Sequence, residues 1–230
     1  MTKDKTKRDR TQKLMLTALF SALITVGAFI KIPVPIVPFT MQMCFVNMAG
    51  LMLGGFYGGL SVFIYLFLGL IGIPIFAHGG GVQYIFNPTF GYLVGMLVGA
   101  TLCGYISHYH GKTSYFKMIL GTVATFICVY TFGLSHAALI AEFYTKSPIP
   151  ASVLFTSYFA VFLPGDIATC ALTVVASMKL IPILEKQGYE VASLTYRRKC
   201  CDMVAKENVR CETISSTSDV QDNSRDDIDE

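Results

Sequence analysis

FGYLVGMLVGATLCGYIS, residues 90–107, holds no charged side chain in 18 consecutive positions. A helix of about 20 mostly apolar residues crosses the hydrocarbon core of a bilayer, which is about 30 Å thick. Outward from this run, between Leu14 and Met178, the formally charged residues are Lys31, Lys112, Lys117, Glu142, Lys146 and Asp166. They divide the chain into apolar blocks near spanning length. We therefore predict an integral membrane protein.

The composition agrees with this prediction. The chain is 53% hydrophobic and 14% charged, whereas about 25% of residues in soluble domains are charged. We predict an all-α membrane protein with six transmembrane helices. The expected spans are residues 14–30, 40–55, 58–76, 90–107, 116–140 and 165–184. The uncharged glycine-rich turn at residues 54–59 leaves two alternatives for the second and third spans, which either cross separately or form a re-entrant pair.

Lysine and arginine are unevenly distributed over the loops, and such an excess marks cytoplasmic loops. With the N-terminus inside, the cytoplasmic side collects the basic arm at residues 1–13 and most of the later basic residues, while Lys31 and Lys146 lie outside. We predict a multi-pass protein of the cytoplasmic (inner) membrane with both termini in the cytoplasm. Residues 14–184 form the membrane domain that binds substrate. Residues 185–230 form a polar, acidic and disordered tail, which is either a solvated extension or a partner-binding segment.

Several kinds of chemistry have no motif in the chain. The seven cysteines lack metal-ligand spacing, and Walker A, His-Glu-x-x-His and Gly-x-Ser-x-Gly motifs are absent from the sequence. We expect no catalytic residue, metal, cofactor or nucleic-acid partner. Energy for any transport would come from a partner or a gradient.

Asp166 follows Phe162-Leu163-Pro164-Gly165, where a helix must break and restart. A carboxylate within the membrane costs several kcal/mol by most estimates, so such a residue usually serves a ligand or an ion. It would also cap the last helix near the positive end of the helix dipole. The two roles are compatible, and we predict that Asp166 binds a ligand.

The predicted topology places three unusual stretches on the outer side, at residues 31–42, 77–92 and 148–166. The first has three prolines that prevent helix formation, so it is either a lid over an outward-facing pocket or a stiff linker. The second contains Gly79-Gly80-Gly81, which lets backbone approach a ligand closely. Asn87 and Thr89 in that stretch either contact the ligand or cap the fourth span.

Ala18 and Ala22 form a small-xxx-small pair on the first span. This spacing lets another helix pack closely. The neighbour is either a helix of the same chain or a partner subunit.

Ordered motifs give the chain a family resemblance over residues 14–182. They are Ala18-x-x-x-Ala22, Pro38-Phe39-Thr40-x-Gln42, Leu51-x-Leu53-Gly54, Gly79-Gly80-Gly81, Pro88-Thr89-x-Gly91-Tyr92 and Phe162-Leu163-Pro164-Gly165-Asp166. With them the sequence resembles the BioY family, the biotin-specific substrate-binding (S) components of energy-coupling factor transporters.

The resemblance implies a six-helix S-component bundle whose outward-facing pocket binds biotin beneath the loop that follows the first helix. It implies that Ala18 and Ala22 face a membrane-embedded coupling subunit driven by two ATPases. Asp166 would accept N–H bonds from the ureido ring. The full set of candidate substrate-binding residues is Phe39, Gln42, Gly80, Gly81, Tyr84, Asn87, Tyr92, Asp166 and Thr169.

One residue departs from the family pattern. The family usually has a lysine three residues after Pro-Gly-Asp, suited to the biotin carboxylate, and this chain has Thr169 there. Either Thr169 or Lys31 takes over that contact, or the ligand is a biotin precursor or relative. The alternatives to biotin uptake are a carrier, working alone or not, for another small vitamin-like amphiphile, and a membrane enzyme that acts on a lipid or isoprenoid with Asp166, His78 and Tyr84 as acid/base groups.

Overall fold

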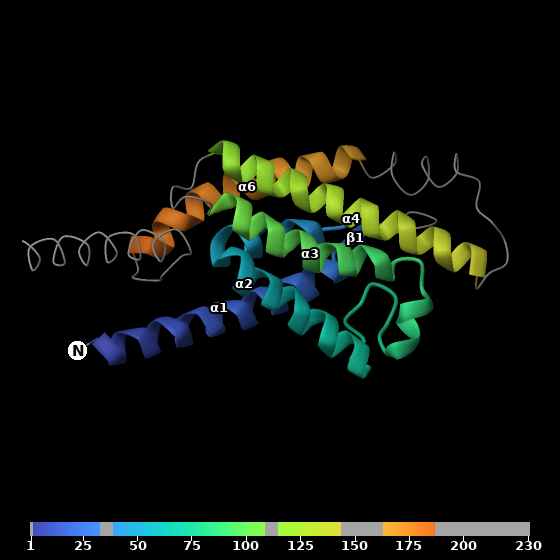
Figure 1. The fold of residues 1–230 in the computed structure, drawn as a ribbon, viewed down its shortest axis with the longest axis horizontal. Coiled ribbons are helices and arrows are strands. Elements are labelled where there is room, and N and C mark those ends of the chain that lie inside the picture. Colours follow the sequence, from blue (N-terminus) through green and yellow to red (C-terminus); the bar gives the residue numbers. More distant parts are fainter. Residues whose placement is uncertain (1, 33–38, 109–114, 144–162, 187–230) are drawn as a thin grey trace, which may run out of the picture.

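The structure is a computed structural model that describes residues 2–32, 39–108, 115–143 and 163–186. Its elements in chain order are α1 (Thr2–Phe29), β1 (Lys31–Ile32), β2 (Phe39–Thr40), α2 (Gln42–Ile71), η1 (Val82–Phe86), α3 (Phe90–Ser107), α4 (Tyr115–Phe143) and α6 (Leu163–Lys186). The helices run roughly along one long axis, with α4 and α6 on one side of the bundle and α1 on the other (Figure 1).

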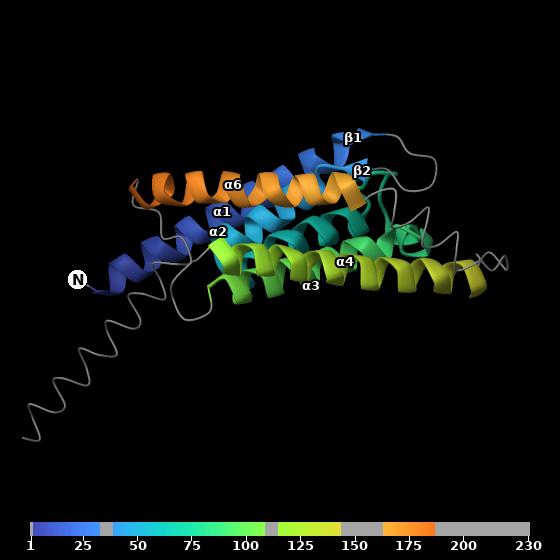
Figure 2. The same cartoon turned by 90° about the horizontal axis from the view of Figure 1, so that it is seen from above.

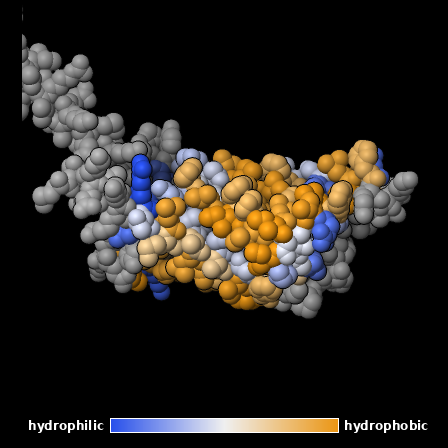
Figure 3. All heavy atoms as spheres, turned by 90° about the horizontal axis from the view of Figure 1, so that it is seen from below, coloured by the Kyte–Doolittle hydropathy of each residue, from blue (hydrophilic) through white to orange (hydrophobic). Residues whose placement is uncertain are grey.

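Five helices in the described part of the chain are long and apolar enough to cross a membrane. Hydrophobic side chains cover the middle of the face shown in Figure 3, and hydrophilic ones lie nearer both ends. Their exposure is expected for side chains that face lipid rather than water. The prediction of an all-α, multi-pass membrane protein is confirmed.

Most predicted helix positions are confirmed, and one end is wrong. Helix α3 has the predicted bounds, and α6 begins at Leu163 beside the expected break. The third span was expected to continue to residue 76, but the helix ends at Ile71. Gly72 ends it with φ +120°, and its N–H donates back to the carbonyls of Gly69 and Leu68. A left-handed glycine of this kind is a common helix terminator.

Helix α2 contains the second and third predicted spans as two arms, residues 42–53 and 55–71. Gly54 separates them with φ 82° and ψ 177°, a conformation essentially restricted to glycine. The arms fold back on each other, since a Cβ added at Gly58 would lie 2.8 Å from the Cα of Gly50. The first arm is the centre of the bundle and is buried on nearly all sides.

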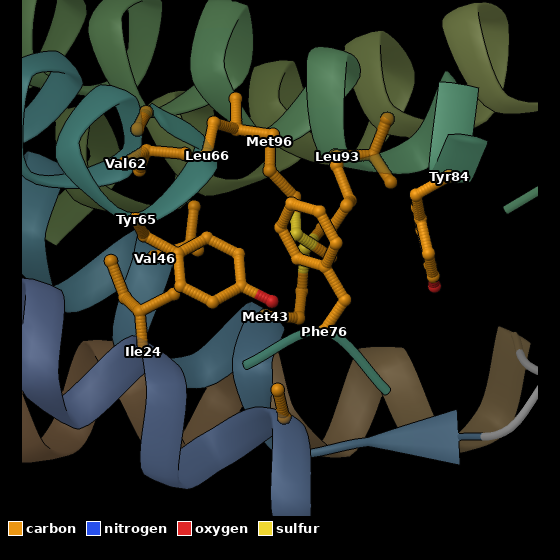
Figure 4. Packing of buried hydrophobic residues seen from close by; sticks show 13 residues of the cluster. Ile24, Met43, Val46, Val62, Tyr65, Leu66, Phe76, Tyr84, Leu93 and Met96 are labelled. Carbon is orange, nitrogen blue, oxygen red and sulfur yellow. The ribbon is translucent and has the colours of Figure 1, made fainter. Parts of the chain in front are cut away.

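The core around this first arm is apolar. Met43 and Val46 lie between Ile24 of α1, Tyr65 of the second arm and Met96 of α3 (Figure 4). A helix that is hydrophobic on every face is expected in such a central position.

Glycines let α3 approach its neighbours at backbone distance. A Cβ at Gly95 would lie 2.6 Å from the Cα of Val129 in α4, and one at Gly104 would overlap the backbone of Gly54 and Gly55. Close packing of this kind holds membrane helices together, because lipid removes most of the hydrophobic driving force between them. Helix α3 therefore ties α4 to α2.

Different elements lie at the two ends of the bundle (Figures 1 and 2). We call the end with the β1–β2 pair, η1 and the start of α6 the loop end. The other, with Lys13, the Gly54 bend, Lys117 and Lys179, we call the basic end. Helix α1 runs from the basic end to the loop end, and α6 runs back.

Some predictions concern residues outside the described part of the chain. They are the lid at residues 33–38, the apolar segment at residues 151–162 and the acidic tail. All three stay predictions.

Gly104→Ala should lower the free energy of unfolding of the purified protein by about 1–3 kcal/mol, because the added methyl meets backbone that cannot rotate away. Leu102→Ala is the matched control, since Leu102 lies exposed on the same helix. Melting curves in detergent measure both variants. An unchanged curve for Gly104→Ala would contradict the packing described above.

Candidate functional site

Asp166 lies in the first turn of α6 at the loop end and is half-buried. Tyr130 of α4 donates its hydroxyl to Oδ2 of Asp166 at 2.5 Å. The carboxylate also lies near the positive end of the α6 dipole, which favours negative charge. Helix capping and ligand binding thus stay compatible roles, and the carboxylate joins α6 to α4.

Tyr130 is itself held by aromatic neighbours. Its ring lies edge-on to Tyr92 of α3, with 6.0 Å between centroids, and packs against Phe126 at 4.6 Å. Tyr92, Tyr130 and Asp166 therefore form a row across α3, α4 and α6. Two of these three residues were predicted from the sequence, and Tyr130 was missed.

A second group of predicted residues surrounds η1. The Tyr84 hydroxyl lies 2.9 Å from Oγ1 of Thr89, whose own hydroxyl donates to Oδ1 of Asn87 at 2.8 Å. The backbone N–H of Thr89 donates to the same Asn87 oxygen at 3.0 Å. Tyr84 is buried against Phe76, and burial raises the pKa of its phenol. Asn87 thus stabilises the turn that leads into α3, while the N-cap residue Thr89 makes no side-chain capping bond to the helix.

Gly80 and Gly81 fit their loop onto the end of α2. The N–H of Gly81 donates to the carbonyl of Gly69 at 2.8 Å, and Gly81 has φ +105°. A Cβ at Gly80 would overlap the carbonyl of Ile73. The packing of this chain alone therefore explains why both positions are glycine.

Gln42 is the first residue of α2 and is 4% exposed. Among the described residues, its Nε2 has no hydrogen-bond partner. The Gln42 side chain lies beside the hydroxyl of Tyr65, which donates its own proton to the carbonyl of Ile75 at 3.3 Å. A buried donor without an acceptor costs about 1–3 kcal/mol, so this amide is suited to receive a ligand acceptor. Phe39, three residues before Gln42, pairs with Ile32 in the β1–β2 ladder.

Thr169 lies one turn after Asp166 and is buried. Its hydroxyl donates to the backbone carbonyl of Asp166 at 2.9 Å. Donation to a ligand carboxylate would require this bond to break, so Thr169 is not a direct equivalent of a lysine.

A buried polar seam joins α6 to the central arm of α2, and the sequence analysis did not predict it. Thr173 donates to the carbonyl of Thr169 at 2.7 Å and lies 3.3 Å from Sγ of Cys44. Asn47, which is fully buried, places Nδ2 4.0 Å from Sγ of Cys170. The hydroxyls at positions 169, 173 and 177 recur every four residues, a spacing that marks one helix face.

Ala18 and Ala22 lie on the exposed face of α1. The opposite face of the helix, with Thr17, Phe20 and Ile24, packs into the bundle. The small-residue pair is therefore available to a neighbour outside the described residues. Among all residues that the structure describes, no three His, Cys, Asp or Glu side chains are placed to hold a metal.

Comparison with known families identifies the fold. The BioY family model matches residues 1–186 of the chain. The chain belongs to the BioY family. Both the matched range and the family agree with the resemblance inferred from the sequence motifs.

Curated relatives carry the same family name. The chain is 41% identical over 130 residues to a probable biotin transporter BioY of Lysinibacillus sphaericus, covering 56% of this chain and 66% of that protein. It is 40% identical over 124 residues to the biotin transporter BioY of Thermotoga maritima, covering 54% and 72%. Over 194 residues it is 31% identical to a biotin transporter BioY of Lactococcus lactis, covering 80% and 95%.

A solved structure has the same fold. It is the crystal structure of the S-component for biotin from an ECF-type ABC transporter, with a TM-score of 0.64 and 29% identity. The alignment covers 78% of this chain and 94% of the other. This BioY-family chain therefore has an S-component fold.

Tyr130→Phe should lower the free energy of unfolding by about 1.5–3 kcal/mol, because a half-buried carboxylate loses its donor while the ring contacts remain. The double variant with Asp166→Asn should lose less than the sum of the two single changes, since both single changes disrupt the same bond. Tyr105→Phe removes a hydroxyl from an exposed tyrosine of α3 and serves as the control. Additive losses in the double variant would argue against the bond.

Proposed function

We propose that this protein captures biotin and brings it across the membrane as the substrate-binding component of a transporter. The observation that carries the proposal is the row of Tyr92, Tyr130 and Asp166 at the loop end of an S-component fold. The curated relatives are named biotin transporters. The protein is a transporter component and not an enzyme, and no cofactor is indicated.

Asp166 is the proposed acceptor for the ureido N–H groups of biotin. Tyr130 occupies Oδ2, so Oδ1 is the atom we assign to the ligand. A carboxylate makes stronger hydrogen bonds than a neutral acceptor does. The hydroxyl of Tyr130 fixes its orientation before the ligand arrives, which lowers the entropy lost on binding.

Gln42 and Tyr92 complete the proposed contacts that the structure supports best. The unpartnered Nε2 of Gln42 would donate to a carbonyl or carboxylate oxygen of biotin. Tyr92 would offer ring surface to the apolar bicycle. Six further residues lie in or beside the elements of the loop end, and we keep them in the proposed site around these contacts. They are Phe39, Gly80, Gly81, Tyr84, Asn87 and Thr169.

The proposed orientation places the loop end outside the cell and the basic end in the cytoplasm. Lys13, Lys117 and Lys179 lie at the basic end, which is the distribution expected for a cytoplasmic face. Counted with the two arms of α2 as separate crossings, the bundle has six membrane helices and both termini inside. The host membrane is then the cytoplasmic (inner) membrane.

A coupling subunit with two ATPases is the proposed energy source. The exposed Ala18 and Ala22 would let a partner helix approach the backbone of α1. Lipid alone does not require two small residues one turn apart on an exposed face.

Asp166→Asn should weaken biotin binding roughly 10- to 100-fold, because the ligand loses charge-assisted hydrogen bonds. Equilibrium binding of labelled biotin to membranes that contain the protein measures the change. Glu142→Gln removes an exposed carboxylate from the last turn of α4 and serves as the control; this variant should bind biotin normally. If wild-type membranes retain no labelled biotin, the proposed function is wrong; equal affinity in Asp166→Asn removes only this residue from the site.

Ala18→Trp should leave biotin binding unchanged and reduce uptake to near background, because the indole blocks close approach of a partner helix. Ile127→Trp, at an exposed position on α4, is the control for a bulky lipid-facing residue. Uptake into cells that contain the coupling subunit measures both variants. Full uptake by Ala18→Trp would contradict docking at this face.

A further inference from the structure

A groove opens between α4 and α6 along the middle of the bundle, on the basic side of the Tyr130–Asp166 bond. Its volume is about 570 Å³. The residues that line it are Ile119, Thr122, Val123, Phe126, Ile167, Cys170, Ala171, Val174 and Val175. The rim residues Ile119, Val123, Ile167, Ala171 and Val175 are exposed, so the groove opens sideways from the bundle.

The groove offers almost nothing to a polar guest. The hydroxyl of Thr122 donates to the carbonyl of Met118 on its own helix. The sulfur of Cys170 lies toward Asn47 of α2. The remaining lining is aliphatic or aromatic, so an apolar chain gains most from occupying it.

A second, smaller hollow of about 190 Å³ continues the same seam toward the basic end. It is lined by Tyr115, Met118, Met178 and Ile181. These residues extend the lining stripes of both helices by one turn, because positions three or four apart share a helix face. The two hollows therefore lie in line between α4 and α6, and we call them together the track.

Charge appears where this track reaches the basic end. Lys179 follows Val175 by four residues, so it continues the groove rim on α6, and it is exposed. Tyr115 begins α4 and is 69% exposed. Tyrosine and lysine at this depth are typical of the headgroup region of a bilayer.

We propose that this track binds one anionic phospholipid, with an acyl chain in the groove and the headgroup phosphate at Lys179 and Tyr115. From residue 167 to residue 175 the groove is about 12 Å long, close to the half-thickness of the hydrocarbon core, about 15 Å. The lysine lies about 6 Å further along the axis. An acyl chain and its headgroup match this order of apolar and cationic surface.

The lipid site adjoins the proposed biotin site, because Phe126 in the groove packs against Tyr130, but the two proposals do not depend on each other. The groove lies beyond the Tyr130–Asp166 bond from the loop end, and it requires only that α4 and α6 cross a membrane. A failure of biotin transport would leave the lipid proposal standing, and the reverse also holds.

Tryptophan fluorescence tests the proposal directly, because the natural chain contains no tryptophan. Phe126→Trp places one probe on the groove floor, and Phe63→Trp places another on the exposed surface of α2. The full-length variants are reconstituted in phosphatidylcholine with brominated acyl chains, which quench nearby indoles. Unbrominated phosphatidylglycerol should restore fluorescence of the Phe126→Trp variant about fivefold more effectively than unbrominated phosphatidylcholine does, the effect expected for one lysine. The probe at position 63 should show no preference.

Lysine variants assign the headgroup. In the Phe126→Trp background, Lys179→Gln should abolish the phosphatidylglycerol preference. Lys117→Gln should retain it, because Lys117 shares its helix face with Gly121, which packs against α3. Equal preference at the two probe positions, or a preference that survives Lys179→Gln, would overturn the proposal. Absence of quenching at position 126 alone would also overturn it, because protein rather than lipid would then fill the groove.

A second measurement covers the case in which Phe126→Trp does not fold. Native mass spectrometry of the full-length protein should find phosphatidylglycerol retained by Ala168→Phe and lost from Ala171→Phe. Both alanines are exposed on α6, and only Ala171 lines the groove. Equal retention by the two variants would contradict the proposal.

Discussion

The close approach of α3 to α4 and α2 is the contact on which the rest of the bundle depends. Glycines at positions 91, 95 and 99 bring α3 against the backbone of α4, and Thr125 donates across the same interface to the carbonyl of Gly99 at 3.0 Å. Lipid chains are as apolar as leucine, so helices in a bilayer gain more from close packing and interhelical hydrogen bonds than from burying bulk. The contact fixes α4 directly beside Tyr130, because Gly95 packs against the backbone of Val129. Tyr130 then lies beside Tyr92 and reaches Asp166 on α6, so the candidate site follows from a backbone contact.

The sequence predicts the helices well where charge and helix-breaking residues bound them. Residues 90–107 form one membrane-length helix because the run is free of charge and begins directly after Asn87-Pro88-Thr89. The last helix begins at Leu163 because Pro164 suits a first turn, where its missing N–H is not needed. The bend in α2 was expected within residues 54–59, and the structure places it at the single residue Gly54. The sequence pattern could not show which of these glycines forms the bend, because this depends on the backbone angles of each glycine, which the sequence does not specify.

The site was predicted less completely than the fold. Asp166 is conspicuous because a carboxylate in apolar sequence is rare, whereas Tyr130 is one of several hydroxyl-bearing residues on α4 and its partner is 36 residues away. The same holds for Asn47, whose neighbour on α6 is 123 residues away. A repeat of small residues such as Gly91-x-x-x-Gly95-x-x-x-Gly99 indicates a packing face, but not the helix that packs there. Asn87 shows a further limit, because a residue that caps a turn and a residue that contacts a ligand have the same sequence pattern.

The unequal burial of the helices gives the bundle uneven stiffness. In α6, 22% of the spanning window is buried, compared with 61% in α2. In the described part of the chain, three polar side-chain contacts join α6 to its neighbours, namely Tyr130–Asp166, Asn47–Cys170 and Thr173–Cys44, whereas moving α3 would require separating backbones in van der Waals contact. Thermal energy is therefore expected to shift α6 more readily than α3, as is typical of a less densely packed part of a fold. Since Asp166 lies in the first turn of α6, small rigid-body excursions of this helix change the position of the carboxylate while the contacts of α3 with α4 and α2 stay in place.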